Sequence, residues 1–309
     1  MKKISLIIPC FNEEKNIFPF YELCKNTLNP SFKYEFIYIN DGSRDKTFEK
    51  IKSLIDYSND EIIAINFSRN FGKESAILAG LKNSTGDYIS LIDADLQQHP
   101  KYVNEMIELL ENNEDLDLVA AYQKKRKESK VLTGFKSLFY SLINKISDTK
   151  FEKNASDFRT FRKNVAKSIM ELDEYHRFSK GLFSWVGFNT HFIPYDVEKR
   201  KFGETTWSFR SLIKYAIEGF VGYSTAPLKF ASFLGMITSF ISLIYMFWTI
   251  IQKLFIGIKV EGYATIVSLI LLLSGIQLIC IGILGEYLAK TYMEVKKRPH
   301  YIIKNIVKK

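Results

Sequence analysis

The stretch Tyr88-Ile89-Ser90-Leu91-Ile92-Asp93-Ala94-Asp95 decides the fold of this chain. Its first five residues are mostly apolar and favour β structure, so they predict a buried strand. The two carboxylates that follow are expected just past the carboxyl end of that strand. An apolar strand closed by a polar cluster is the unit that recurs through the amino-terminal part of the sequence.

The recurrence predicts alternating strands and helices. The strands are expected at residues 4–8, 34–39, 62–66, 88–92 and 116–121, and the helices at residues 16–25, 47–55, 73–82 and 102–112. This alternation indicates an α/β fold with a mostly parallel sheet covered by helices on both faces. Polar clusters at residues 9–13, 40–43 and 93–97 follow three of the strands. Because ligands bind beyond the carboxyl ends of strands in such sheets, we expect these clusters to form the site.

The carboxyl-terminal part has a different composition. The 309 residues are 47% hydrophobic and 25% charged, which is ordinary for a globular protein, but residues 230–252 and 262–285 contain no charged side chain. Each run exceeds the roughly 20 residues that a helix needs to cross a bilayer. We therefore expect five parts: an α/β head at residues 1–200, a juxtamembrane loop and amphipathic helix at 201–229, transmembrane helices at 230–252 and 262–288, and a basic tail at 289–309.

Flanking charges predict the orientation in the membrane. The start of the chain does not resemble a signal peptide, because its short apolar run ends at Pro9. The tail is rich in lysine, whereas the loop between the spans carries only Lys253 and Lys259 as basic residues, so the head and both termini are expected in the cytosol. Much of the net charge of +9 lies beside the membrane, where it would attract anionic headgroups. The sequence lacks a basic stripe with interleaved stacking aromatics, so no nucleic-acid partner is expected.

Asp93 and Asp95 are the central candidates for chemistry. Two hard oxygen donors separated by one residue suit Mg²⁺ or Mn²⁺, with diphosphate oxygens completing the coordination shell. A metal held in this way neutralises charge on a leaving nucleoside diphosphate. Asp41 and Gln97 would add oxygen donors nearby. The Asp-x-Asp pattern alone is weak evidence, and its neighbours make it specific.

Those neighbours occur in a recognisable order. The segments are Ile7-Ile8-Pro9-Cys10-Phe11-Asn12-Glu13-Glu14, Asn40-Asp41-Gly42-Ser43-Arg44-Asp45, Ser68-Arg69-Asn70-Phe71-Gly72-Lys73, Gly86-Asp87 and Asp93-Ala94-Asp95-Leu96-Gln97. The order resembles the family 2 glycosyltransferases of the GT-A fold, and within them the dolichol-phosphate mannose synthases and bacterial bactoprenol glucosyltransferases. The bacterial branch is matched by Asp157-Phe158-Arg159, by the segment from Lys180 to Gly187, and by Leu284-Gly285-Glu286-Tyr287 with the later Arg298-Pro299. The resemblance covers nearly the whole chain.

The resemblance implies a role for each matching position. The nucleotide-sugar would be bound by Pro9, Phe11, Asn12, Glu13, Asp41, Lys73 and Asp93, with Asp41 at the base or ribose. The metal would be bound by Asp93, Asp95 and Gln97. The catalytic set would be Asp93, Asp95, Asp157 and Arg159, and the phosphates would meet Arg159 and a basic loop containing Arg200 and Lys201. Without the resemblance, Arg159 and Arg200 could equally be surface residues.

The implied reaction is an inverting, metal-dependent hexosyl transfer to undecaprenyl phosphate in the bacterial inner membrane, supplying a sugar donor for cell-envelope glycosylation. UDP-glucose is the first choice of donor and UDP-N-acetylglucosamine the alternative, and relatives suggest a homo-tetramer. A phosphate monoester carries close to two negative charges near neutral pH, so it is a nucleophile without deprotonation. We therefore expect Asp157 to orient groups such as Arg159 more than to act as a base.

The sequence also bears on three alternative functions. A processive polysaccharide synthase would carry a Gln-x-x-Arg-Trp segment and more than two spans. A nucleotidyltransferase would open with a glycine-rich loop, which is absent after the first strand. A membrane scaffold with an inactive head would be expected to lose acidic or phosphate-contacting positions, whereas Asp41, Asp93, Asp95 and Arg159 are all present.

Overall fold

The computed structural model describes residues 1–124, 155–198, 224–255 and 262–309. In these residues the head contains one eight-stranded sheet of order β7-β5-β6-β4-β1-β2-β3-β8. The elements are β1 (Lys3–Cys10), α1 (Ile17–Thr27), β2 (Lys33–Asn40), α2 (Thr47–Tyr57), β3 (Glu61–Phe67), α3 (Lys73–Asn83), β4 (Tyr88–Leu91), α4 (Lys101–Asn112), β5 (Leu118–Gln123), β6 (Ala155–Arg162), α6 (Lys163–Glu171), α7 (Ser179–Trp185), β7 (Thr190–Tyr195), α9 (Ala226–Phe255), α10 (Tyr263–Val295) and β8 (Ile303–Lys308). The strands and helices expected before residue 124 are all present.

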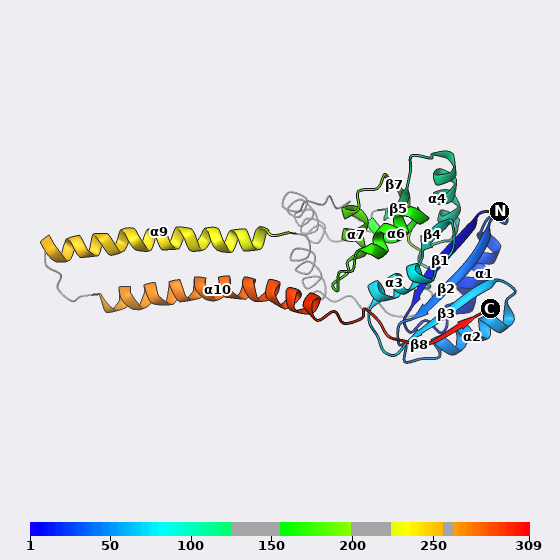
Figure 1. Ribbon diagram of the computed structural model, residues 1–309, viewed down its shortest axis with the longest axis horizontal. Helices are drawn as coiled ribbons and strands as arrows, with labels where there is room; N and C mark the ends of the chain where they lie inside the picture. The colour runs from blue at the N-terminus through cyan, green and yellow to red at the C-terminus, as the bar shows by residue number, and fades with distance from the viewer. Residues whose placement is uncertain (125–154, 199–223, 256–261) are drawn as a thin grey trace.

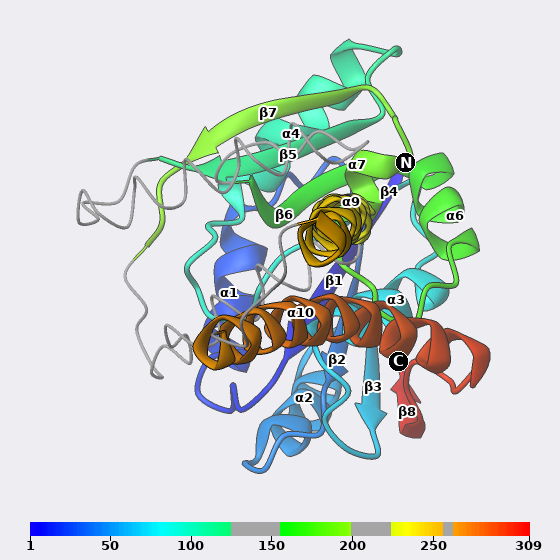
Figure 2. The ribbon, with the colours of Figure 1, turned by 90° about the vertical axis from the view of Figure 1, so that its left-hand side faces the viewer.

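Apolar side chains cover both faces of the sheet, as a mostly parallel sheet requires. Along β1, Ile4, Leu6 and Ile8 belong to the core on one face, and Ile7 belongs to the core on the other. Helices α1, α2 and α4 supply side chains to the first core, and α3, α6 and α7 supply the second. Figure 2 shows the sheet twisting from β7 to β8 with α1 and α2 on one side and α3 and α6 on the other. The predicted α/β fold with two covered faces is confirmed.

The sheet is mixed at its edges. Strands β3, β2, β1 and β4 run parallel, whereas β6 runs antiparallel to both β4 and β5. The sequence pattern did not predict β6, yet this strand is inserted beside β4 and pairs Arg159 with Leu91. Its position brings residues 155–162 next to the strand that leads into Asp93.

The tail also contributes to the sheet, which the sequence did not predict. Strand β8 pairs antiparallel with β3, and the backbone N–H of Lys309 donates to the carbonyl of Ile62 at 3.1 Å. The ring of Tyr301 stacks on that of Phe67, with centroids 4.9 Å apart. Residues 303–308 of the basic tail therefore form one edge of the sheet.

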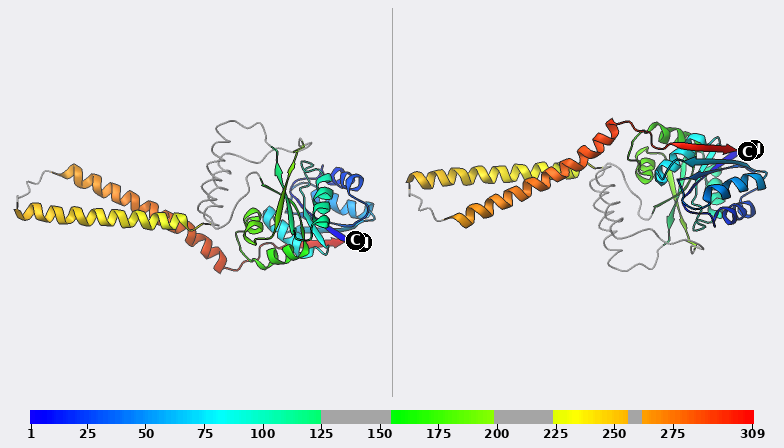
Figure 3. Two further views of the ribbon diagram at one scale, coloured as in Figure 1. Left: turned by 90° about the horizontal axis from the view of Figure 1, so that it is seen from above. Right: turned by 90° about the horizontal axis from the view of Figure 1, so that it is seen from below.

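Helices α9 and α10 extend side by side away from the head, and both chain termini lie at the head's far end (Figures 1 and 3). Residues Ala226–Gln252 and Thr265–Val295 are long and apolar enough to cross a membrane, with mean hydropathies of 1.9 and 2.6, and they are not buried. The helices contact each other, since Sγ of Cys280 on α10 donates to the carbonyl of Ala231 on α9 at 3.7 Å, and the hydroxyl of Tyr287 donates to the carbonyl of Ser224 just before α9 at 2.6 Å. Their exposed apolar surface fits a lipid environment.

Some expectations lie outside the described residues. These are the basic pair Arg200 and Lys201 and, up to residue 223, the juxtamembrane loop and amphipathic helix expected at residues 201–229. They stay predictions.

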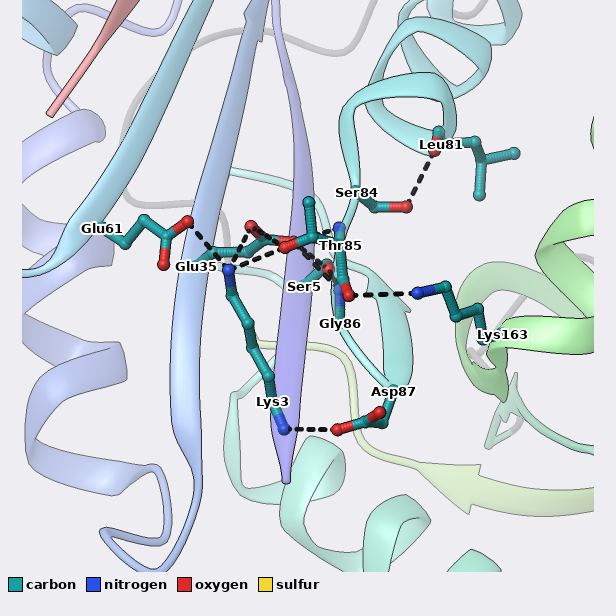
Figure 4. A network of polar contacts seen from close by, with 10 residues as sticks. All are labelled: Lys3, Ser5, Glu35, Glu61, Leu81, Ser84, Thr85, Gly86, Asp87 and Lys163. Carbon is teal, nitrogen blue, oxygen red and sulfur yellow. Dashed lines mark hydrogen bonds and ion pairs between the residues drawn. The ribbon is translucent and has the colours of Figure 1, made fainter. Parts of the chain in front are cut away.

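A buried polar network fixes the amino ends of the central strands (Figure 4). Glu35 of β2 is fully buried and forms an ion pair with Lys3 of β1 at 2.9 Å. It also accepts hydrogen bonds from the backbone N–H of Thr85 at 2.6 Å and of Gly86 at 3.2 Å. This network ties the turn before β4 to β1 and β2. The carboxyl ends of the same strands carry the candidate site.

Candidate functional site

The three predicted polar clusters meet at one edge of the sheet. The backbone N–H of Asp41 donates to the carbonyl of Cys10 at 2.9 Å, so the loop after β2 begins beside the end of β1. On the other side of β1, the N–H of Ile92 donates to the carbonyl of Ile7 at 3.1 Å. Residues 9–13, 40–43 and 93–97 therefore lie side by side. Figure 1 shows this edge on the side of the head that faces α9 and α10, since β1 runs from the far end toward them.

The segment after β4 presents oxygen donors in alternation. Asp93, Asp95 and Gln97 are partly exposed, whereas the residue after each of them is buried: Ala94, Leu96 and Gln98. Buried Gln98 holds the first carboxylate, because its Nε2 donates to Oδ2 of Asp93 at 2.9 Å and its Oε1 accepts from the Asp93 backbone N–H at 2.9 Å. The sequence analysis missed Gln98, and its alternation with Gln97 is the signal that could have revealed it.

Lys73 links two carboxylates from different strands. Its Nζ lies 2.6 Å from Oδ1 of Asp93 and 3.3 Å from Oδ2 of Asp157. The register of β4 and β6 explains this meeting: Leu91 pairs with Arg159, so continuing the register two residues past the end of β4 brings Asp93 opposite Asp157 of β6. The structure thus joins three residues that are far apart in the sequence, and the basis for this is the antiparallel β6.

The charges of this cluster perturb one another. Burial alone would raise the pKa of Asp157, but the neighbouring cations Lys73, Lys180 and Arg159 outweigh burial and lower it to about 2. Burial would lower the pKa of Lys73, but Asp93 and Asp157 raise it above its ordinary value. Asp157 is therefore a carboxylate and Lys73 an ammonium at neutral pH.

Two further groups that the sequence analysis left without a role lie beside Asp157. Glu74 of α3 accepts hydrogen bonds from the backbone N–H of Ser179 at 3.0 Å to each carboxylate oxygen. Lys180 follows on α7, and its side chain interacts electrostatically with Asp157. The segment starting at Lys180 carries part of the family resemblance, and that was the available signal.

Arg159 is buried, which contradicts the alternative of an ordinary surface arginine. Its guanidinium stacks over the ring of Phe183 on α7, 4.3 Å from the ring centroid, and donates to the carbonyl of Ser156 at 2.8 Å. These contacts fix a positive charge near Asp157. The catalytic role of Arg159 and its contact with a phosphate stay predictions.

The loop after β1 has its backbone fixed and its side chains partly exposed. The N–H of Asn12 donates to Oγ of Ser43 at 2.9 Å, and Oδ1 of Asn12 accepts from the N–H of Arg44 at 2.9 Å. Asn12 has a φ of 57°, a conformation that asparagine tolerates better than most residues. Phe11 is 42% exposed beside it. The loop thus joins the first two clusters and offers an exposed aromatic face.

Asp41 is buried, and both of its carboxylate oxygens accept backbone hydrogen bonds. They accept from the N–H of Phe71 at 2.7 Å and from the N–H of Gly72 at 2.9 Å. Gly72 has a φ of 96°, which favours glycine. Asp41 therefore fixes the loop that leads into Lys73. Its expected contact with a base or ribose is not tested by this geometry.

The donor set suits a divalent cation when a ligand supplies further oxygens. Asp93, Asp95 and Gln97 offer only hard oxygen atoms, as Mg²⁺ and Mn²⁺ prefer. Among the described residues no group of three or more His, Cys, Asp or Glu side chains could hold a metal by itself. The residues present therefore fit a cation shared with a diphosphate.

Comparison with known proteins places these features in a family. Residues 5–170 match Glycosyl transferase family 2, and residues 226–291 match the GtrB C-terminal hairpin. The chain is 41% identical over 303 residues to the putative glycosyltransferase CsbB of Bacillus subtilis (strain 168), covering 97% of this chain and 91% of that protein. It is 38% identical over 307 residues to the prophage bactoprenol glucosyl transferase homolog of Escherichia coli (strain K12), covering 99% and 100%.

The fold has solved counterparts. One is the glucosyl-3-phosphoglycerate synthase of Mycobacterium tuberculosis in complex with Mn²⁺, uridine diphosphate and glucosyl-3-phosphoglycerate, with a TM-score of 0.50 and 16% identity over 71% of this chain and 78% of that one. This likeness supports the GT-A fold of the head.

Proposed function

Because the chain belongs to glycosyl transferase family 2, we propose that it transfers glucose from UDP-glucose to undecaprenyl phosphate. That it is a glycosyltransferase follows from its family and its relatives. The observation that carries the finer proposal is the Asp93, Lys73 and Asp157 cluster at the sheet edge that faces two apolar helices. A site in that position can take one substrate from water and the other from a membrane.

The proposed donor lies between the first loop and Asp95. Pro9, Phe11, Asn12 and Glu13 line the nucleotide side, with Asp41 holding the adjoining loop. A divalent cation bound by Asp93, Asp95 and Gln97 would neutralise the charge on the departing diphosphate. The ammonium of Lys73, already beside Asp93, is placed to meet the same negative charge.

The proposed acceptor reacts as a phosphate dianion. One of its oxygens attacks the anomeric carbon, the bond from that carbon to the diphosphate oxygen breaks, and UDP leaves with the electron pair, so the configuration inverts. The attacking oxygen needs no base. Asp157 stays ionised and holds Lys73 and its neighbouring cations in place, consistent with its low pKa.

The proposed orientation puts the head and both termini in the cytosol of a bacterial cell, with the two apolar helices in the inner membrane. Supporting this, β8 pairs with β3, so the segment after α10 returns to the side of the membrane that holds the head. A homo-tetramer stays a prediction.

The test is transfer of radiolabelled sugar from a panel of nucleotide-sugars to undecaprenyl phosphate in nanodiscs, with Mg²⁺ or Mn²⁺. Label from UDP-glucose in the lipid fraction is the expected result. Label from UDP-N-acetylglucosamine alone would correct the sugar and keep the reaction. Absence of lipid product from every donor, with correctly folded protein, would refute the proposed acceptor.

A further inference from the structure

Helix α7 is joined by hydrogen bonds to the residue that follows Lys73. Its first residue, Ser179, donates its backbone N–H to both carboxylate oxygens of Glu74, and its hydroxyl donates to the same carboxylate. Glu74 is the neighbour of Lys73 on α3. The next residue of α7, Lys180, is therefore held close to the Lys73 and Asp157 pair.

Lys180 is a half-buried cation whose charge is poorly compensated. Burial lowers its pKa, Arg159 and Lys73 lower it further, and Asp157 and Glu74 offset this only in part. Among the described residues Lys180 forms no ion pair or hydrogen bond through its ammonium group. An ammonium in this environment binds an anion favourably, because the anion supplies the missing compensation.

Three cations and three carboxylates share the surroundings of Asp157. The cations are Lys73, Arg159 and Lys180, and the carboxylates are Asp157, Glu74 and Asp93. Lys73 is committed to carboxylates, and Arg159 is buried against Phe183 and donates to a main-chain carbonyl. Lys180 is the one of the three that the described contacts leave to an incoming group.

Helix α7 contacts both α3 and β6 around Lys180. Ser179, the residue before it, donates its backbone N–H to Glu74 of α3, and Phe183 of the same helix packs against the guanidinium of Arg159 of β6. In Figure 1, α7 lies on the part of the head that faces the apolar helices.

We propose that Lys180 binds the phosphate of the lipid acceptor and positions its attacking oxygen. This inference rests on the proposed function. The proposed ligand of Lys180 is the phosphate of the acceptor. The alternative ligand is the diphosphate of the donor, which would present the same kind of negatively charged oxygen.

The test compares Lys180→Met and Lys180→Gln with Lys180→Arg and with Lys167→Met, an exposed lysine on the neighbouring α6. Each full-length variant is assayed in nanodiscs for KM of undecaprenyl phosphate and of UDP-glucose, and for equilibrium binding of labelled undecaprenyl phosphate without donor. Loss of one charge-assisted hydrogen bond predicts a rise of at least about tenfold in the KM and Kd for the lipid. KM for the donor should stay within about twofold, and Lys180→Arg should recover most of the affinity.

The outcomes separate the two proposals. A rise in KM for UDP-glucose instead would assign Lys180 to the donor and overturn the inference, as would lipid affinities equal to those of Lys167→Met. Both neutral variants should keep the wild-type unfolding temperature, and a marked fall in both would mean a structural role and also overturn it. If the wild-type protein binds the lipid but transfers no sugar, the proposed function fails while the binding comparison still decides on Lys180.

Discussion

Replacing Glu35 with glutamine should destabilise the head strongly. The carboxylate is fully buried, lies 2.9 Å from the Lys3 ammonium and accepts two backbone N–H groups. Removing one partner of a buried ion pair costs about 3–5 kcal/mol. Because glutamine keeps one acceptor oxygen, we expect the lower end, about 3 kcal/mol, which corresponds to a fall of about 6–12 °C in Tm.

Glu61→Gln is the matched control, since Glu61 pairs with the same lysine at 2.8 Å but its side chain is 48% exposed. An exposed pair contributes about 0.2–1 kcal/mol, so its loss should lower Tm by no more than about 4 °C. Thermal unfolding of full-length protein in detergent, followed by intrinsic fluorescence, measures both variants. Equal shifts for the two variants would refute the reasoning from burial.

The pH dependence gives a second readout of Glu35. Burial would raise the pKa of this carboxyl, but hydrogen bonds from Ser5 and Thr85 and the contact with Lys3 lower it below its ordinary value. A lowered folded-state pKa stabilises the protein above the unfolded pKa, and this stabilisation is lost as pH falls through the folded pKa. The difference in Tm between wild type and Glu35→Gln should therefore be full at pH 7 and shrink below about pH 4.3.

Three further predictions concern the site and the tail. Asp95→Asn should reduce sugar transfer at least about 100-fold and weaken metal-dependent UDP binding, with exposed Asp115→Asn unaffected in both assays. Because the pKa of Asp157 is about 2, the ratio of wild-type to Asp157→Asn transfer rates should stay constant from pH 5 to 8, and a ratio that falls steadily toward pH 5 would contradict this. Tyr301→Ala removes the stack on Phe67 and should cost about 1–3 kcal/mol in thermal unfolding, and an unchanged Tm would show that β8 is held without it.

Local sequence determined the repeating part of the head. The apolar run of residues 4–8 and its counterparts predicted the strands, because β-branched residues bounded by polar clusters favour buried β structure. Because the carboxyl ends of parallel strands share an edge of the sheet, residues 9–13, 40–43 and 93–97 were predicted to lie together, and in the structure they do. Two uncharged runs, each long enough for a helix to cross a bilayer, predicted the two apolar helices.

Tertiary structure decided the contacts between distant segments. Asp157 meets Lys73 and Asp93 only because β6 enters the sheet antiparallel beside β4, and a strand's partner is set by packing and not by its own residues. The same holds for β8. By itself its sequence predicts only a basic tail, and it forms a strand because it pairs with β3; the sequence is Ile303-Lys304-Asn305-Ile306-Val307-Lys308. Sequence alone therefore determined which chemical groups this protein carries. The fold decided which of them share a site, because hydrogen bonding between strands and the burial of charge depend on neighbours that are far away along the chain.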